Sequence, residues 1–106
     1  MPQLVAYRNP NIKTNAQFPL LLDIQSDLLD DLTTTVVIPL SPEARSKGAV
    51  MTKLNPVIEI DDARYVAVTQ QLAGIERRLL GERIEEDLSR FSGGMIAALD
   101  FLISGI

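Results

Sequence analysis

The sequence predicts a mainly β protein, with several short antiparallel strands in a small barrel or sandwich and one C-terminal α-helix. Between residues 4 and 80, short runs of apolar or β-branched residues recur, and Asn, Asp, Pro or Gly separate them. This spacing is typical of all-β folds. Residues 89–106 instead carry apolar side chains at helical spacing. At 106 residues, one domain spanning 1–106 is expected.

The first half of the chain contains three expected strands. Residues 4–7 form the first, and a polar loop over 8–17 follows it. Residues 18–25 form the second, and the acidic segment 26–32 then turns the chain. The β-branched run 33–40 is the clearest strand, and Pro39 predicts a sheet edge or a bend there.

The second half begins with a polar segment over 41–55, the longest expected surface loop, in which Ser41 is suited to cap a short helical turn. Residues 56–60 and 64–69 are expected to form a hairpin around Asp61-Asp62. Residues 75–80 predict another strand that Gly81 ends, and residues 82–88 lead into the helix.

The expected helix begins at Ser89, whose hydroxyl can accept a hydrogen bond from a first-turn N–H. One apolar stripe would dock the helix on the sheet: Phe91, Met95, Ala98, Leu99 and Leu102. Other apolar residues fall outside that stripe: Ile96, Ala97, Phe101 and Ile103. A helix that is apolar nearly all round is buried on more than one side. We therefore expect a two-fold dimer whose interface includes Met95, Phe101 and Leu102.

The composition argues against several classes of function. The chain has no Cys and no His, so it lacks thiolate chemistry, the commonest general base near neutral pH and the commonest metal ligand. The net charge is −4, which disfavours direct nucleic-acid binding. We see no signal-peptide pattern and no apolar stretch of membrane-spanning length, so a cytoplasmic protein without membrane contact is expected.

No constellation in the sequence indicates catalysis, a metal site or a cofactor. The acidic cluster at residues 23–31 lacks the Gly and Glu of a calcium loop and is interpreted as turn chemistry. Gly93-Gly94 matches no phosphate-binding template, and Arg77-Arg78 is interpreted as a solvated pair. The apolar C-terminal helix therefore points to protein binding.

Several blocks of the sequence resemble the CcdB family of toxins from bacterial toxin–antitoxin modules. These blocks are Asp-Ile-Gln-Ser-Asp-Leu-Leu-Asp at 23–30, Val-Ile-Pro-Leu at 37–40, Asn-Pro-Val-Ile-Glu-Ile at 55–60, Thr69, Gly81-Glu82 and the terminal Ser-Gly-Ile. The resemblance implies a small SH3-like barrel of five to seven antiparallel strands with one C-terminal α-helix, assembled as a homodimer.

The resemblance also implies a function. Such toxins bind the A subunit of DNA gyrase and trap it on cleaved DNA, without chemistry of their own. The implied gyrase-binding residues are Ser104, Gly105 and Ile106, with Ile103 beside them. Ser104 stands where the best-known member has an aromatic residue.

A CcdA-like antitoxin would neutralise the toxin and bring it to operator DNA. Because loops often carry binding function, we expect the antitoxin to contact the two long loops at Arg8, Asn9, Ser41 and Arg45.

Two alternatives remain open. A MazF-like ribonuclease would need Arg and Thr or Ser side chains around a scissile phosphate, such as Arg8, Arg45 and Thr69. A degenerate homologue would keep only antitoxin binding and operon regulation, and the Ser at position 104 keeps this alternative open.

Overall fold

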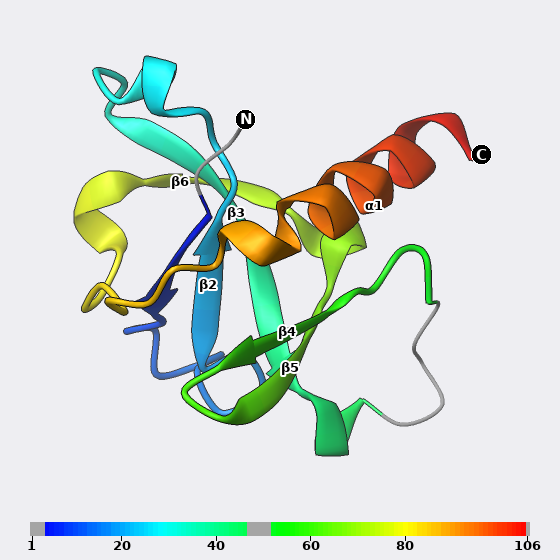
Figure 1. Ribbon diagram of the computed structural model, residues 1–106. Coiled ribbons are helices and arrows are strands. Elements are labelled where there is room, and N and C mark those ends of the chain that lie inside the picture. Colours follow the sequence, from blue (N-terminus) through cyan, green and yellow to red (C-terminus); the bar gives the residue numbers. More distant parts are fainter. Residues whose placement is uncertain (1–3, 47–51, 106) are drawn as a thin grey trace.

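A computed structural model describes residues 4–46 and 52–105 of the chain. Within these ranges, six strands curl into an antiparallel half-barrel, and one α-helix crosses its open side (Figure 1). This confirms the mainly β prediction. The strands are β1 (Val5–Arg8), β2 (Leu20–Asp23), β3 (Thr34–Pro42), β4 (Val57–Ile60), β5 (Ala63–Ala67) and β6 (Ala73–Glu76), and the helix is α1 (Ser92–Ser104).

The nine-residue strand β3 organises the sheet because it pairs with three other strands. The strand order is β1-β2-β3-β5-β4, and β6 pairs with the N-terminal half of β3. Pro39 therefore lies in a central strand and not at an edge. Its carbonyl accepts a hydrogen bond from the N–H of Val68. Because the N–H and C=O of a strand residue point to the same side, the N–H that Pro39 lacks would face the junction between β5 and β6.

Two local predictions have different outcomes in the second half of the chain. The Asp61-Asp62 turn is confirmed, with φ of 53° and 64°, the left-handed conformation that a two-residue hairpin turn requires. The strand expected over 75–80 is shifted, because β6 ends at Glu76 and a 3₁₀ turn, η4 (Arg77–Leu79), follows. The N–H of Arg77 donates to the carbonyl of Thr33, which closes the ladder at that point.

The start of the helix differs from the prediction. Ser89 does not cap an α-helix; it opens a 3₁₀ turn, η5 (Ser89–Phe91), and α1 begins only at Ser92. The N–H of Ser89 is itself bonded to Asp87, whose Oδ1 accepts a 2.9 Å hydrogen bond from it. Chiefly because of this backbone hydrogen bond, the pKa of Asp87 lies below its usual value of 3.8.

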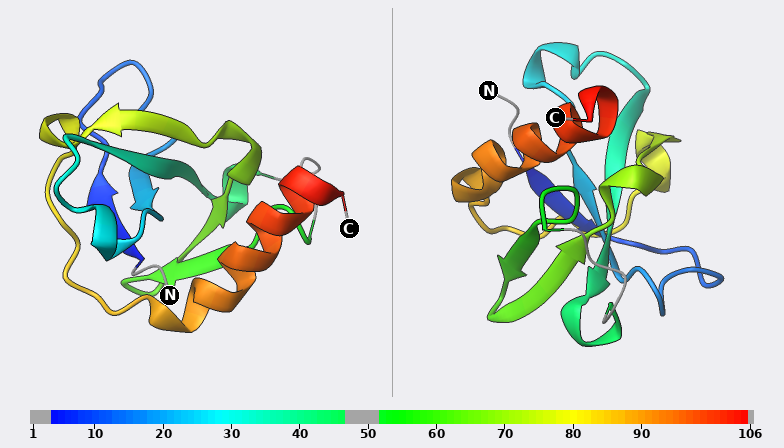
Figure 2. Two further views of the ribbon diagram at one scale, coloured as in Figure 1. Left: turned by 90° about the horizontal axis from the view of Figure 1, so that it is seen from above. Right: turned by 90° about the vertical axis from the view of Figure 1, so that its right-hand side faces the viewer.

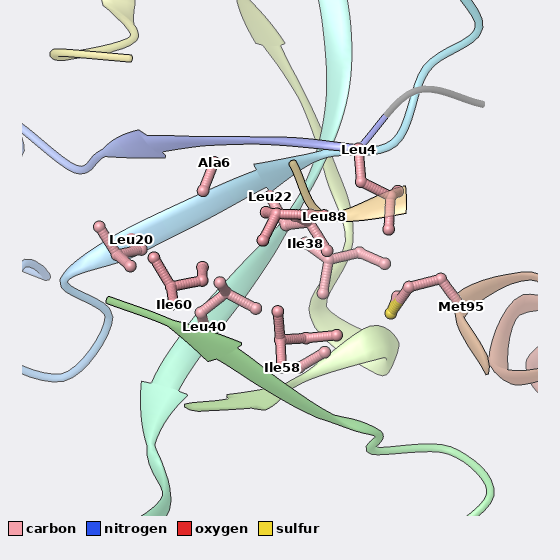
Figure 3. Close-up of a cluster of buried hydrophobic side chains, with 11 residues drawn as sticks. Leu4, Ala6, Leu20, Leu22, Ile38, Leu40, Ile58, Ile60, Leu88 and Met95 are labelled. Atoms are coloured by element: carbon pink, nitrogen blue, oxygen red, sulfur yellow. The ribbon is translucent and has the colours of Figure 1, made fainter. Parts of the chain in front are cut away.

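The hydrophobic core lies between the concave face of the sheet and α1 (Figure 3). Alternate residues of the strands point into it, and Met95 and Ala98 enter from the helix. Leu102, expected in the same stripe, is 37% exposed, because the last turn of α1 extends beyond the sheet (Figure 1). The fully buried members of largest volume are Leu22, Ile38, Leu40, Ile58, Leu88 and Met95.

Candidate functional site

The last turn of α1 presents apolar side chains to solvent. Ile103 is 85% exposed, and Leu102 is exposed beside it. Gly105 ends the helix in the left-handed conformation, with φ of 75°, and its N–H donates to the carbonyl of Phe101. Ser104 is exposed, and its hydroxyl donates a 2.7 Å hydrogen bond to the carbonyl of Asp100. Ile106, the last expected gyrase-binding residue, lies outside the described residues.

A shallow groove of about 280 Å³ runs beside this turn. One wall is the helix surface formed by Gly94, Ala97 and Phe101, and Pro56 and Lys53 stand opposite. The Lys53 ammonium lies 5.9 Å from the centre of the Phe101 ring, within the range of a cation–π contact.

A Cβ on Gly93 would meet nothing within 4 Å, and one on Gly94 would meet only the Pro56 side chain. The two glycines therefore leave open space beside the helix instead of admitting a backbone segment of this chain.

A second group of exposed apolar residues lies in the 3₁₀ turn η1 (Asp27–Leu29) and just after it. Leu28 is 92% exposed, and Leu29 and Leu32 are also exposed. Both η1 and α1 project from the same side of the sheet, the upper side in Figure 1 and in the right-hand view of Figure 2. These leucines were not predicted as a contact surface, because the acidic segment around them indicated only a turn. A signal for their exposure was present in the sequence: Leu28 and Leu29 stand between Asp27 and Asp30 and do not follow the alternation of a core strand.

The expectation that Met95 belongs to the dimer interface was wrong. Its side chain is 1% exposed and packs in the core of its own chain, so it is not available to a second chain. Phe101 is half-buried and Leu102 is exposed. Ile96, which the sequence placed outside the core stripe, is 43% exposed. The apolar surface of the helix beyond the core thus consists of Ile96, Ala97, Phe101, Leu102 and Ile103.

The two loops expected to bind the antitoxin lie side by side. Arg45, in the 3₁₀ turn η2 (Glu43–Arg45), donates a 2.7 Å hydrogen bond from Nη1 to the carbonyl of Ala16. Arg45 and Arg8 are both exposed. Ser41 is 6% exposed, and its hydroxyl accepts a hydrogen bond from the Ser46 hydroxyl, so it supports the loop from within.

Asn9 is also turned inward, so its expected contact with the antitoxin needs correction. Its side chain is buried, and the amide nitrogen donates to the Thr14 hydroxyl and to the carbonyl of Phe18. The amide oxygen accepts from the N–H of Asn11. These bonds hold the ends of the loop together, and Arg8 and Arg45 remain as the exposed members of the expected set.

The charged groups near these loops form ion pairs. Arg64 binds both carboxylate oxygens of Glu43, at 2.9 and 3.1 Å. This hydrogen bonding is the main cause that holds the pKa of Glu43 below its usual value of 4.5. Arg8 pairs with Glu82 at 3.4 Å on the surface. Such exposed pairs contribute little to stability.

The acidic cluster at 23–31 serves turns and ion pairs. Asp23 Oδ1 accepts from the Thr35 hydroxyl at 2.7 Å and from the N–H of Gln25. Arg77 lies 3.7 Å from both Asp23 and Asp30, so the interpretation of Arg77 as a solvated residue was wrong. Arg78, in contrast, is largely exposed. Within residues 4–46 and 52–105, no three acidic side chains gather in a way that could hold a metal ion.

The set proposed for a ribonuclease does not meet at one surface. Thr69 is fully buried in the 3₁₀ turn η3 (Thr69–Gln71), which packs against α1. A scissile phosphate in solvent therefore cannot reach its hydroxyl. Arg8 pairs with Glu82, and Arg45 is bonded to Ala16.

The comparison with protein families agrees with the fold. A model of the CcdB protein family matches residues 3–105, nearly the whole chain. No helix within the described ranges is long and apolar enough to cross a membrane.

Proposed function

The chain belongs to the CcdB family, the toxins of toxin–antitoxin systems, and from that premise we propose that it binds the A subunit of DNA gyrase and traps the enzyme on cleaved DNA. The observation that carries this proposal is the apolar end of α1, where Ile103 is 85% exposed next to the left-handed Gly105. An exposed isoleucine at a helix end adds nothing to the fold, and a partner that covered it would gain its burial energy.

We propose that the active form is a homodimer. Two apolar groups support this, one along α1 and one around η1, because both project from the same side of the sheet (Figure 2). A two-fold axis through that side would bury Phe101, Leu102 and the leucines around η1 against a second copy, and would leave Ile103 and the two chain ends together on one exposed surface. Light scattering that gave only the 11.7 kDa mass of one chain would contradict this.

We propose that a CcdA-like antitoxin binds the toxin at the paired loops around Arg8 and Arg45 and brings it to operator DNA. The loop over 9–18 and the turn η2 lie away from the helix terminus (Figures 1 and 2), whereas Lys53, farther along the second loop, lies beside the Phe101 ring. The exposed guanidinium groups of Arg8 and Arg45 suit carboxylates of an acidic partner. The chain itself carries a net charge of −4, so operator binding is assigned to the antitoxin.

The proposal is tested with purified gyrase, supercoiled plasmid and this protein. The expected result is linear DNA after detergent and protease treatment, in amounts that rise with toxin concentration and fall when the antitoxin is added. A gyrase variant with a substitution in the A subunit that abolishes toxin binding serves as the control. Absence of linear DNA at micromolar toxin would contradict gyrase poisoning.

The Ser at position 104 favours a second candidate function, a homologue that keeps only antitoxin binding and operon regulation. Serine offers none of the stacking area of an aromatic anchor, and its hydroxyl is bonded to Asp100. This candidate predicts tight antitoxin binding and no linear DNA in the same gyrase assay.

A further inference from the structure

The edge of β6 is an open strand edge. The N–H of Ile24 donates to the carbonyl of Val36, so Val36 faces β2, and its neighbours Thr35 and Val37 face β6. In the observed register Thr35 is opposite Ile75 and Val37 is opposite Ala73. The N–H and C=O of Gly74 and the N–H of Glu76 therefore point away from the sheet. Among the described residues, no hydrogen bond reaches these three groups.

The edge of β1 is covered, and that of β4 is contacted at one carbonyl. On β1, Arg8 and Ala6 exchange hydrogen bonds with the segment 81–84, including Gly81 N–H to Arg8 O at 3.0 Å and Ile84 N–H to Ala6 O at 2.8 Å. That contact is close enough that a Cβ on Gly81 would lie 2.5 Å from the Arg8 carbonyl oxygen. On β4, the guanidinium of Arg90 reaches the carbonyl of Glu59. An uncovered edge is a template for another strand.

An apolar groove of about 590 Å³ lies directly beside the β6 edge. Its floor is the convex face of the sheet, where Leu21, Val37 and Pro39 point away from the core. Ile75 and Leu79 form the wall next to the edge, and the loop over 9–18 forms the far wall. The volume is in the range that accepts apolar side chains of a ligand.

We propose that an extended segment of the antitoxin adds to β6 as an antiparallel or parallel strand and inserts alternate apolar side chains into this groove. The outward N–H and C=O groups of a strand edge match those of a second strand, and a strand places every second side chain on one face. The occupant is assigned to the antitoxin because the loop that forms the far wall of the groove directly follows Arg8 and accepts the Arg45 hydrogen bond at the carbonyl of Ala16. Arg8 and Arg45 are the two residues of the proposed antitoxin contact. This inference rests on the proposed antitoxin binding.

Substitutions at Gly74 separate strand addition from other modes of binding. Gly74→Pro removes the outward N–H of this residue, and the pairing of β6 with β3 does not use that N–H. Gly74→Ala keeps the N–H, and its Cβ would meet no atom within 4 Å. The probe is the antitoxin encoded beside this toxin, titrated by calorimetry. Gly74→Pro is expected to weaken binding about tenfold or more, and Gly74→Ala less than about twofold.

A second pair of variants addresses the groove and guards against misfolding of the proline variant. Leu79 lines the groove and is 45% exposed, whereas Leu72 is 37% exposed and does not line it. Leu79→Glu should weaken antitoxin binding about tenfold, and Leu72→Glu should leave it unchanged. Thermal unfolding of all four variants checks the fold.

Amide hydrogen exchange of the wild-type protein completes the test. The amides of Gly74 and Glu76 should exchange rapidly in the free toxin and slowly once the antitoxin is bound. If the antitoxin binds and protects the loop over 9–18 but not these amides, strand addition is wrong and antitoxin binding stands. If the antitoxin does not bind at all, both proposals are wrong. Protection that grows with toxin concentration alone would identify a second copy as the occupant and overturn the proposal.

Discussion

The hydroxyl of Ser104 is bonded to the carbonyl of Asp100, one helical turn earlier, at 2.7 Å. The side chain is thus directed along the helix at the position where the family's best-known member presents an aromatic ring. The neighbouring surface remains apolar, with Leu102 and Ile103 exposed. The last turn of α1 therefore presents an apolar surface next to a serine that carries no aromatic ring.

We predict that Ser104→Trp strengthens gyrase poisoning. A buried tryptophan at an interface contributes about 2–4 kcal/mol, which corresponds to a gain of tenfold or more in affinity. Ser104→Ala is the matched control, since it removes the hydroxyl without adding area, and it should leave inhibition unchanged. The measurement is the toxin concentration that gives half-maximal inhibition of supercoiling. An unchanged value for Ser104→Trp would show that this position does not contact gyrase.

Shortening a side chain of α1 to alanine should destabilise the fold at Met95 and leave its stability nearly unchanged at Ile103. Met95→Ala leaves a cavity in the core, because the side chain is 1% exposed, and should lower the free energy of unfolding by about 2–5 kcal/mol. Ile103→Ala removes a side chain that is 85% exposed and should change stability by less than about 0.5 kcal/mol. Urea unfolding measures both. Equal losses would mean that Ile103 is buried, in the dimer or elsewhere.

Asn9→Ala should open the loop over 9–18. The buried amide makes three hydrogen bonds inside the loop, and its removal leaves the Phe18 carbonyl and the Asn11 N–H without this partner. The expected cost is about 1–3 kcal/mol. Asn15→Ala, in the same loop but exposed, is the control and should cost little. Faster amide exchange throughout the loop in Asn9→Ala alone would support this, and identical exchange in both variants would refute it.

The stability of the chain should depend on the ionisation of Asp87. Its pKa is lowered in the folded state, so its contribution is present above the unfolded value of 3.8 and is lost as the pH falls through the lower folded value. Asp87→Asn can still accept the Ser89 hydrogen bond but cannot ionise. The variant should therefore lose less stability than the wild type as the pH falls below about 4. Parallel melting curves for the two proteins would show that Asp87 carries no such linkage.

The strands were predictable where local pattern and tertiary environment agree. The runs at β3 and β4 are β-branched, and the Asp61-Asp62 turn fixes its hairpin, so these elements lie close to their expected places. The boundary of β6 was wrong because Arg77 is drawn toward Asp23, a contact across more than fifty residues that no local pattern records. The start of α1 was wrong because Ser89 opens a 3₁₀ turn and its own N–H is bonded to Asp87, so the α-helix begins only at Ser92.

The candidate site was predictable as a segment but not residue by residue. The apolar excess of α1 indicated a partner surface, yet the sequence alone could not separate Met95, which packs in the core, from Ile103, which is exposed. The same holds for Asn9 and Arg8, which are adjacent in the loop but turned inward and outward. The open edge of β6 depends on which strands pair, and no residue type in that segment marks it.

Deletion of Gly105 and Ile106 tests the central claim most directly. Burying an isoleucine contributes about 1.5–3 kcal/mol, and a two-fold dimer would lose it twice. The core residues of α1 remain, so the truncated protein should keep the melting temperature of the full chain, yet form no linear DNA with gyrase at concentrations where the full chain does. A truncated protein that poisons gyrase as well as the full chain would contradict the claim that the C-terminus of this toxin is its gyrase-binding site.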